Sequence, residues 1–257
     1  MSKKNPTPGP PPKEPKRKGS KDVPQVSSVE KLEERKASLP LAQLVGSEER
    51  FFELVERGDT ASVETFLNEH RSMNVNCINY KGLSALHIAL KRQHESMVRM
   101  LIQRPDVEVR DAALHAVATG NIDFTTVVLD LINIKNPGTE MLGCADSPEY
   151  SPDITPLSLA AQNGDYQMVR MLLARGHTLE KPHGPSCLCP KCKSLLREHG
   201  SSLSRIRLNS YKAICNPSYI CQVTDDPILY SFLLDSEMAE SSRMDKEFKV
   251  SLKDLVR

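Results

Sequence analysis

The chain repeats one short pattern of apolar and small residues four times, and this repetition limits the possible fold more than any other feature. Each copy has an apolar segment, then a turn, then a second, amphipathic segment. The apolar segment carries one residue that is expected to face inward, at position 54, 89, 116 or 160. Apolar residues in the second segments recur three or four positions apart, which is the spacing of one buried helix face. The sequence therefore predicts an all-α fold built of helix pairs, whose first segments are 51–59, 86–94, 113–121 and 157–165.

The turn between the two segments has its own signature. Gly58, Gly120 and Gly164 occupy it in three copies, and Gln93 takes the place of glycine in the second. Glycine tolerates the left-handed backbone that ends a helix, and the Asp or Asn that follows can cap the next one. Such helix–turn–helix units bury a continuous core only by stacking on one another.

Two of these segments carry a recognisable motif. Ser84-Ala-Leu-His87-Ile-Ala89 and Thr155-Pro156-Leu-Ser-Leu-Ala160 resemble the Thr-Pro-Leu-His-x-Ala motif of ankyrin repeats. The expected architecture is an ankyrin-repeat solenoid of about four repeats. His87 and His115 occupy positions where that family uses a hydrogen-bonding histidine, so a structural role is predicted for both.

The repeat spacing is irregular. The inner positions 54, 89, 116 and 160 lie 35, 27 and 44 residues apart, whereas ankyrin repeats are about 33 residues long. The third repeat is therefore predicted to have lost part of its hairpin. An insertion from Asn133 to Asp153 precedes the fourth, and we expect it to be a loop that reaches out of the stack as a contact surface.

A cluster of one histidine and three cysteines follows the repeats: His183, Cys187, Cys189 and Cys192. Thiolate sulfur and imidazole nitrogen are ligands that tetrahedral zinc prefers. Four protein ligands would leave no coordination position open. The spacing predicts a structural zinc site. Three other readings stay open at this point: free thiols on a loop, a Cys189–Cys192 redox pair, or a different soft metal ion.

Composition excludes several functions. Lys plus Arg number 34 against 33 for Asp plus Glu, aromatic residues make up 5% and tryptophan is absent, so no nucleic-acid partner is expected. There is no apolar run of membrane-spanning length and no secretory signal. Four of the seven cysteines are scattered singly, which fits reduced thiols in the cytosol. No catalytic set or phosphate-binding glycine loop is present, so the chain is not expected to be an enzyme.

The sequence divides into four regions. Residues 1–46 form a Pro/Lys-rich tail predicted to be disordered, with room for a short charged helix before Pro40. The repeats are assigned to 47–181, the zinc-binding loop to 182–200 and linker helices to 201–257.

The linker region is predicted to hold two helices. The first runs from Ser201 to Cys215, and the second begins with Asp226 as its cap and Pro227 in its first turn. Ile228, Leu229, Phe232 and Leu233 are predicted to form the buried face of the second helix. This helical pattern continues to Arg257 without a stop signal, so we expect the linker region to be truncated there.

Several stretches together resemble one channel family. They are the block from Ala160 to His177, the Cys/His cluster, and Arg207-Leu-Asn-Ser-Tyr-Lys-Ala213. They look like the N-terminal cytoplasmic region of TRPC-subfamily transient receptor potential cation channels. The resemblance implies tetrameric plasma-membrane channels that pass Ca²⁺ and other cations. It also implies zinc bound by His183, Cys187, Cys189 and Cys192.

The expected function is the cytoplasmic assembly and regulatory region of such a calcium-permeable, non-selective channel, with no pore in this chain. Its partners would be other channel subunits and regulatory proteins bound by the ankyrin surface, with membrane contact only through a downstream region. The alternative is a free-standing, cytosolic ankyrin-repeat adaptor or truncated isoform that binds channel subunits or other proteins.

Overall fold

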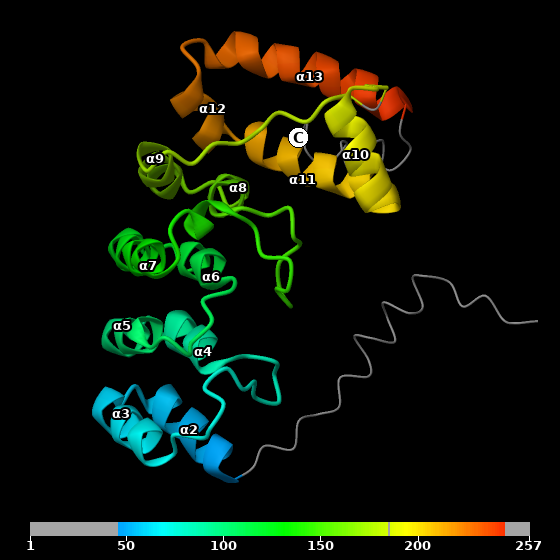
Figure 1. Cartoon of the computed structure of the whole chain (residues 1–257). Coiled ribbons are helices and arrows are strands. Elements are labelled where there is room, and N and C mark those ends of the chain that lie inside the picture. Colours follow the sequence, from blue (N-terminus) through cyan, green and yellow to red (C-terminus); the bar gives the residue numbers. More distant parts are fainter. Residues whose placement is uncertain (1–45, 185, 245–257) are drawn as a thin grey trace, which may run out of the picture. The chain divides into compact units, whose positions relative to one another are not determined.

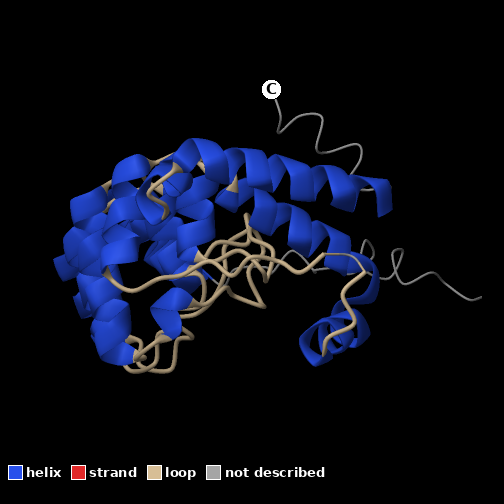
Figure 2. Ribbon diagram, turned by 90° about the horizontal axis from the view of Figure 1, so that it is seen from above, coloured by secondary structure: helices blue, strands red, loops and turns tan. Residues whose placement is uncertain are grey.

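A computed structural model describes residues 46–184 and 186–244, and these residues form helices joined by loops (Figure 2). Within those ranges the strand-like pairing amounts to one isolated bridge, between Ile78 and Ser84. The predicted all-α fold is confirmed. The predicted disordered tail lies outside the described residues, except for Gly46, which begins the first helix described.

Four helix hairpins follow one another along the chain (Figure 1). The first helices of the hairpins pack in the order α2, α4, α6, α8, and the second helices pack in the order α3, α5, α7, α9. The predicted ankyrin-repeat solenoid is therefore confirmed. The hairpins are α2 (Gly46–Arg57) with α3 (Thr60–Glu69), α4 (Ala85–Lys91) with α5 (Glu95–Gln103), α6 (Ala112–Ala118) with α7 (Ile122–Lys135), and α8 (Pro156–Gln162) with α9 (Tyr166–Ala174).

Small side chains at the inner positions let the first helices approach closely. Ala89, Ala116 and Ala160 have no exposed surface, and each lies on a first helix that packs between two others. A larger side chain there would have to displace close-packed neighbours. Leu54, the equivalent residue of α2, is only partly buried, because α2 packs against α4 alone among the first helices described.

The residues that start the second helices act as predicted from their type. The side chains of Asp59, Asn121 and Asp165 accept hydrogen bonds from backbone N–H groups three residues further on. Each of these bonds satisfies a donor that the first helical turn leaves without an internal partner.

The turns between paired helices need a left-handed residue. Gly58, Gly120 and Gly164 have φ values of 76°, 69° and 73°. Gln93 has a φ of 54° at the same place in the second repeat, although its Cβ disfavours that conformation. Its Oε1 accepts a hydrogen bond of 2.9 Å from Asn121 Nδ2, which links the second repeat to the third.

The shortened third repeat keeps both of its helices. The missing residues belong to the connection before it, because 104–111 separates α5 from α6 whereas 70–84 separates α3 from α4. Lys135, the last residue of α7, stabilises the short connection by donating from Nζ to the backbone carbonyls of Ile102, Arg104 and Val107.

The insertion before the fourth repeat is a mostly exposed loop that extends beyond the helices, as predicted, but it is also tied to the stack at several points (Figure 1). It contains a short 3₁₀ helix, η1 (Thr139–Met141), whose buried Glu140 accepts a 2.7 Å hydrogen bond from Arg175 Nη2. Ser147 donates to Asp111, and Glu149 pairs with Lys91 at 2.5 Å. Polar groups spread along the insertion thus hold it against three different repeats.

The stack continues beyond the fourth repeat. Helix α10 (Pro190–His199) and η2 (Gly200–Ser202) lead into α11 (Leu203–Ile214), which packs on α8, while α12 (Pro217–Val223) packs on α9. The Gln162 amide donates to the Asn209 carbonyl, and the Gln222 amide donates to the Tyr166 carbonyl, both at 2.9 Å. Helices α11 and α12 therefore occupy the place of a fifth hairpin.

The last helix described, α13 (Pro227–Met244), presents a face that the sequence pattern did not predict. Leu234 and Met238 are buried, and α13 packs against α12. The predicted buried face was wrong, because Ile228, Leu229, Phe232 and Leu233 are all more than half exposed. At 3.6 residues per turn, these four residues lie on the side of the helix opposite Leu234 and Met238.

The turn at Gln93 gives a direct test of the repeat geometry. Replacing Gln93 by Ala removes the bond to Asn121 and keeps a Cβ in the left-handed conformation, whereas replacing it by Gly removes the bond and the strain together. We expect Gln93→Gly to be more stable than Gln93→Ala by about 1 kcal/mol in urea unfolding. Equal stability of the two variants would show that this turn carries no strain.

Candidate metal centre

The four residues of the Cys/His cluster come together in space. His183 Nδ1 lies 3.5 Å from Cys187 Sγ, 3.3 Å from Cys189 Sγ and 3.3 Å from Cys192 Sγ. One ligand atom from each residue lies within 4.8 Å of all the others, so this group could hold a metal ion. The sequence spacing identified each of the four.

The start of α10 positions two of the sulfurs. Cys189 is the N-cap residue, Pro190 begins the helix, and the backbone N–H of Cys192 donates to Cys189 Sγ at 3.4 Å. The two-residue gap between the cysteines is thus the first turn of the helix, where exposed N–H groups favour a thiolate. A turn closed by the Cys187 N–H and the Gly184 carbonyl, 3.1 Å apart, brings the other two ligands back to this helix end.

The thiols differ in their ionisation. A hydrogen bond from the Cys192 backbone lowers the pKa of Cys189 to about 6. Burial and the neighbouring Cys189 and Cys187 sulfurs raise the pKa of Cys192 to about 11. One cysteine therefore ionises readily, and its negative charge opposes ionisation of a second cysteine. A bound cation would reduce this repulsion between thiolates.

Ion pairs tie the segment leading into the cluster to two helices. Glu180 pairs with Lys191 of α10, and Lys181 Nζ lies 2.6 Å from Glu237 of α13. Lys191 also interacts electrostatically with the thiols of the cluster. Its pKa is raised first by Glu180 and to a smaller extent by Cys189 and Cys192. The segment before the Cys/His cluster is therefore tied by ion pairs to α10 and to α13.

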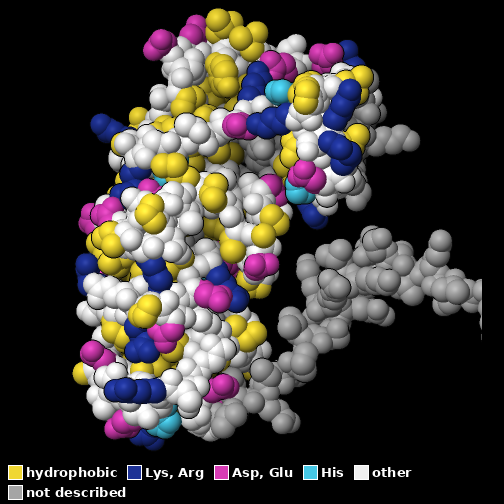
Figure 3. Space-filling model, viewed as in Figure 1, with side chains coloured by type: hydrophobic (Ala, Val, Ile, Leu, Met, Phe, Trp, Pro, Cys, Tyr) yellow, Lys and Arg dark blue, Asp and Glu magenta, His cyan; other side chains and the backbone are white. Residues whose placement is uncertain are grey.

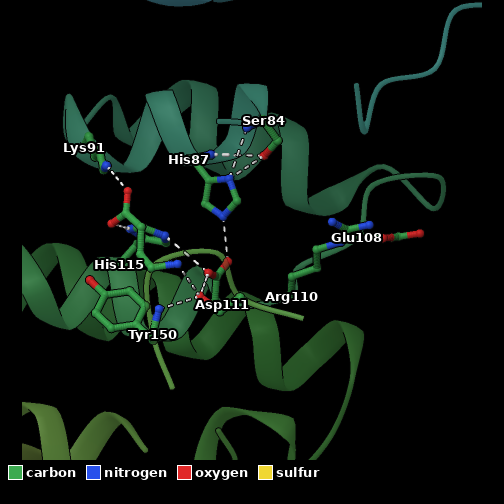
Figure 4. A network of polar contacts seen from close by, with 10 residues as sticks. Ser84, His87, Lys91, Glu108, Arg110, Asp111, His115 and Tyr150 are labelled. Carbon is green, nitrogen blue, oxygen red and sulfur yellow. Dashed lines mark hydrogen bonds and ion pairs between the residues drawn. The ribbon is translucent and has the colours of Figure 1, made fainter. Parts of the chain in front are cut away.

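A second group of close ligand atoms lies inside the repeats, where His87, Asp111 and His115 also fall within 4.8 Å of one another (Figure 4). All three are buried. His87 Nε2 lies 2.6 Å from Asp111 Oδ1, and His115 Nε2 lies 3.4 Å from Asp111 Oδ2. Sequence reasoning found the two histidines and missed the aspartate between them.

Hydrogen bonding leaves His87 without a lone pair for a metal. The backbone N–H of Ser84 donates to His87 Nδ1 at 3.1 Å, so Nδ1 is the acceptor and Nε2 carries the hydrogen that Asp111 receives. A metal on Nε2 would break that bond and require a deprotonated ring. The geometry fits a structural tie between repeats, as predicted for His87 and His115.

Asp111 is the centre of this tie. Burial opposes its charge, but the close approach of His115 and the hydrogen bonds from His87 and Ser147 hold the pKa of Asp111 well below its usual range. The ring of His115 lies between those of His87 and Tyr150, with centroid distances of 4.6 and 5.2 Å (Figure 4). One carboxylate thereby joins the second repeat, the third repeat and the insertion.

Comparisons with known proteins agree with this architecture. Residues 51–183 match the family of ankyrin repeats in three copies, and residues 187–249 match the family described as transient receptor ion channel II. Short transient receptor potential channel 3 of Homo sapiens is 32% identical, with 80% of this chain and 24% of the relative covered. Short transient receptor potential channel 4 of Mus musculus is 35% identical, with 84% of this chain and 23% of the relative covered. The transient receptor potential-gamma protein of Drosophila melanogaster is 35% identical, with 84% of this chain and 20% of the relative covered.

The chain belongs to the ankyrin-repeat family, whose matched segment runs through the stacked hairpins. The transient receptor ion channel II segment directly after the repeats, together with these identities, makes it an N-terminal region of the TRPC type. It spans about a quarter or less of the length of these curated relatives. Short transient receptor potential channels 3 and 4 are named as channels and not as enzymes, which agrees with the expectation for this chain. No helix within 46–184 and 186–244 is both long and apolar enough to cross a membrane.

The buried carboxylate predicts a specific loss of stability. Asp111→Asn keeps the shape of the side chain but replaces charge-assisted hydrogen bonds by weaker ones, and we expect a loss of about 2 kcal/mol at pH 7 in urea unfolding. Asp106→Asn is the matched control, since Asp106 is exposed and pairs with Arg104 at 3.0 Å. We expect this control to lose less than about 1 kcal/mol.

The same variant predicts a pH dependence. The pKa of Asp111 is lower in the folded chain than in the unfolded chain, so its stabilisation is full above the unfolded value of about 4 and declines as the pH falls below it. The stability gap between the wild type and Asp111→Asn should therefore narrow from pH 5 to pH 3. A gap that is absent at pH 7, or that widens in acid, would contradict the assigned role.

Proposed function

We propose that this chain is the assembly and regulatory region of a TRPC-type cation channel and lies on the cytoplasmic side of the plasma membrane. The observation that carries the proposal is the order of the matched segments, with ankyrin repeats followed at once by the transient receptor ion channel II segment. Two of the relatives are named as short transient receptor potential channels, and the third is named as the transient receptor potential-gamma protein.

The proposed parent protein is a tetrameric, calcium-permeable and non-selective channel. In this proposal, other parts of the parent channel conduct the ions. The role left to the chain is binding, through a stack of repeats that presents an extended surface. Its proposed partners are other channel subunits and regulatory proteins.

We propose zinc as the ion of the Cys/His cluster. A tetrahedral zinc ion with Zn–N of ~2.0 Å and Zn–S of ~2.3 Å holds its nitrogen and sulfur ligands about 3.5 Å apart. The three distances from His183 Nδ1 to sulfur, 3.5, 3.3 and 3.3 Å, support that fit. With four protein ligands, zinc would supply structural cross-linking rather than catalysis.

In this proposal, zinc orders one connection of the chain and is not needed to fasten the repeats to the linker helices. Helix α11 packs directly on α8, and α12 packs on α9, so that junction has its own apolar contacts. Zinc would instead fix His183 and Cys187 to the first turn of α10, ordering residues 183–199. The ion pairs of Glu180 and Lys181 support the same local assignment.

The zinc proposal predicts a measurable metal content. Protein purified under reducing conditions should contain about one zinc per chain, and the double variant Cys189→Ser/Cys192→Ser should retain less than about a tenth of it. Cys221→Ser is the control, because Cys221 is exposed and lies outside the cluster. Its zinc content should equal that of the wild type. Less than half a zinc per wild-type chain, or equal loss in the control, would overturn the assignment.

A chimera tests the channel proposal. The matching N-terminal segment of mouse short transient receptor potential channel 4 is replaced by this chain, and assembly and cation current are measured in transfected cells. We expect the chimera to form tetramers and conduct, whereas the same channel lacking the segment should do neither. A chimera that behaves like the deletion would favour the alternative, a free-standing adaptor.

A further inference from the structure

Helix α13 exposes an apolar stripe that nothing in the proposed zinc or channel role uses. Ile228, Leu229, Phe232 and Leu233 are 73%, 56%, 70% and 53% exposed. Their spacing of i, i+1, i+4 and i+5 places them on one face of the helix, which we call the α13 stripe. An exposed cluster of four large apolar side chains on one helix face is typical of an interaction site.

A groove lies beside the stripe and shares residues with it. Its volume is about 500 Å³, and Ile228 and Phe232 form one wall while the buried side chains of Ile220 and Met238 form another. Apolar side chains gather over α13 on the surface seen in Figure 3, with acidic side chains near them. A groove of this size accepts one or two bulky side chains of a partner helix.

The border of the stripe is mainly acidic, and the basic residue of α13, Arg243, lies in the last turn of the helix. Between residues 224 and 242 the chain has five acidic residues and no Lys or Arg. Asp225, Asp235 and Glu240 are exposed, while Glu237 pairs with Lys181. An apolar surface with an acidic border attracts a ligand that is apolar on one side and basic at its edges.

We infer that the α13 stripe and its groove dock a basic amphipathic helix of a partner protein. Apolar side chains spaced three or four residues apart on that helix would cover Phe232 and Leu233, and one of them would enter the groove. Lysine or arginine at the edges would face Asp225 and Asp235. This surface is separate from the metal group and does not depend on the proposed channel function.

Charge disfavours two other occupants. A second copy of this chain meeting the stripe across a two-fold axis would bring the same acidic border against itself. An anionic lipid surface would be repelled by the same carboxylates. A partner that is apolar without basic residues would bury the stripe while leaving the acidic border without compensation.

The test uses the full chain and a fluorescently labelled 18-residue peptide of leucine and lysine with a helical amphipathic pattern. Anisotropy at 0.1 M salt should report binding, and an acidic peptide with glutamate in place of each lysine should not bind. The double variant Phe232→Ser/Leu233→Ser should weaken binding at least tenfold. Asp225→Asn/Asp235→Asn should weaken it about threefold and flatten its salt dependence.

Ile134→Ser is the matched control, because Ile134 is 80% exposed on α7, away from the stripe. It should bind the basic peptide as the wild type does. The substitutions at 225, 232, 233, 235 and 134 alter exposed positions, so the circular dichroism of these variants should match that of the wild type.

Five results would overturn the inference. The basic peptide does not bind, or both peptides bind equally well. Ile134→Ser loses as much affinity as the stripe variant. The wild type forms a dimer that Phe232→Ser/Leu233→Ser abolishes, which would assign the stripe to a second copy. Binding is gained only in Phe248→Asp, which would assign the stripe to residues 245–257 of the same chain.

Discussion

Each helix pair in this protein can bury its apolar face only against the next pair, and the rest of the structure follows from that constraint. Ala89, Ala116 and Ala160 keep the first helices close, and they are fully buried because each faces a neighbour on both sides. The stack cannot end at an exposed α8–α9 hairpin without leaving apolar surface of these two helices in water, because α11 packs on α8 and α12 packs on α9. Helices α11 and α12 cover that end.

Continuing the stack in this way determines where the metal group lies. The chain must cross from the end of α9 at Ala174 to the start of α11 at Leu203, and residues 175–202 contain the crossing. Within it, His183 and the three cysteines fold back on the first turn of α10, and Lys181 pairs with α13. The Cys/His cluster therefore lies in a connection whose two ends are already held by apolar packing, where a bound ion would act as a local brace.

Much of this could be predicted because its signals are local. Each repeat is recognised from a few neighbouring residues: alanine at the inner position, glycine at the turn, and an Asp or Asn cap. The four residues of the Cys/His cluster lie within a segment of ten residues. What was missed concerns contacts between distant residues. The insertion carries loop residues, yet Glu140, Ser147 and Glu149 bind repeats that no local pattern identifies. The face of α13 was misassigned because helical periodicity locates an apolar stripe but not which apolar face packs. Asp111 gave one usable signal, a carboxylate directly before the apolar run 112–117 and four residues before His115.

The central claim is that α11 and α12 are held by the repeats themselves and that metal acts only on the connection. Hydrogen exchange of the native chain, followed by mass spectrometry before and after removal of metal by a chelator, tests this claim directly. The account predicts faster exchange in residues 183–199, with unchanged protection in α8, α9, α11 and α12. Loss of protection in α11 and α12 together with the connection would contradict it, because those helices would then depend on the metal rather than on the stack.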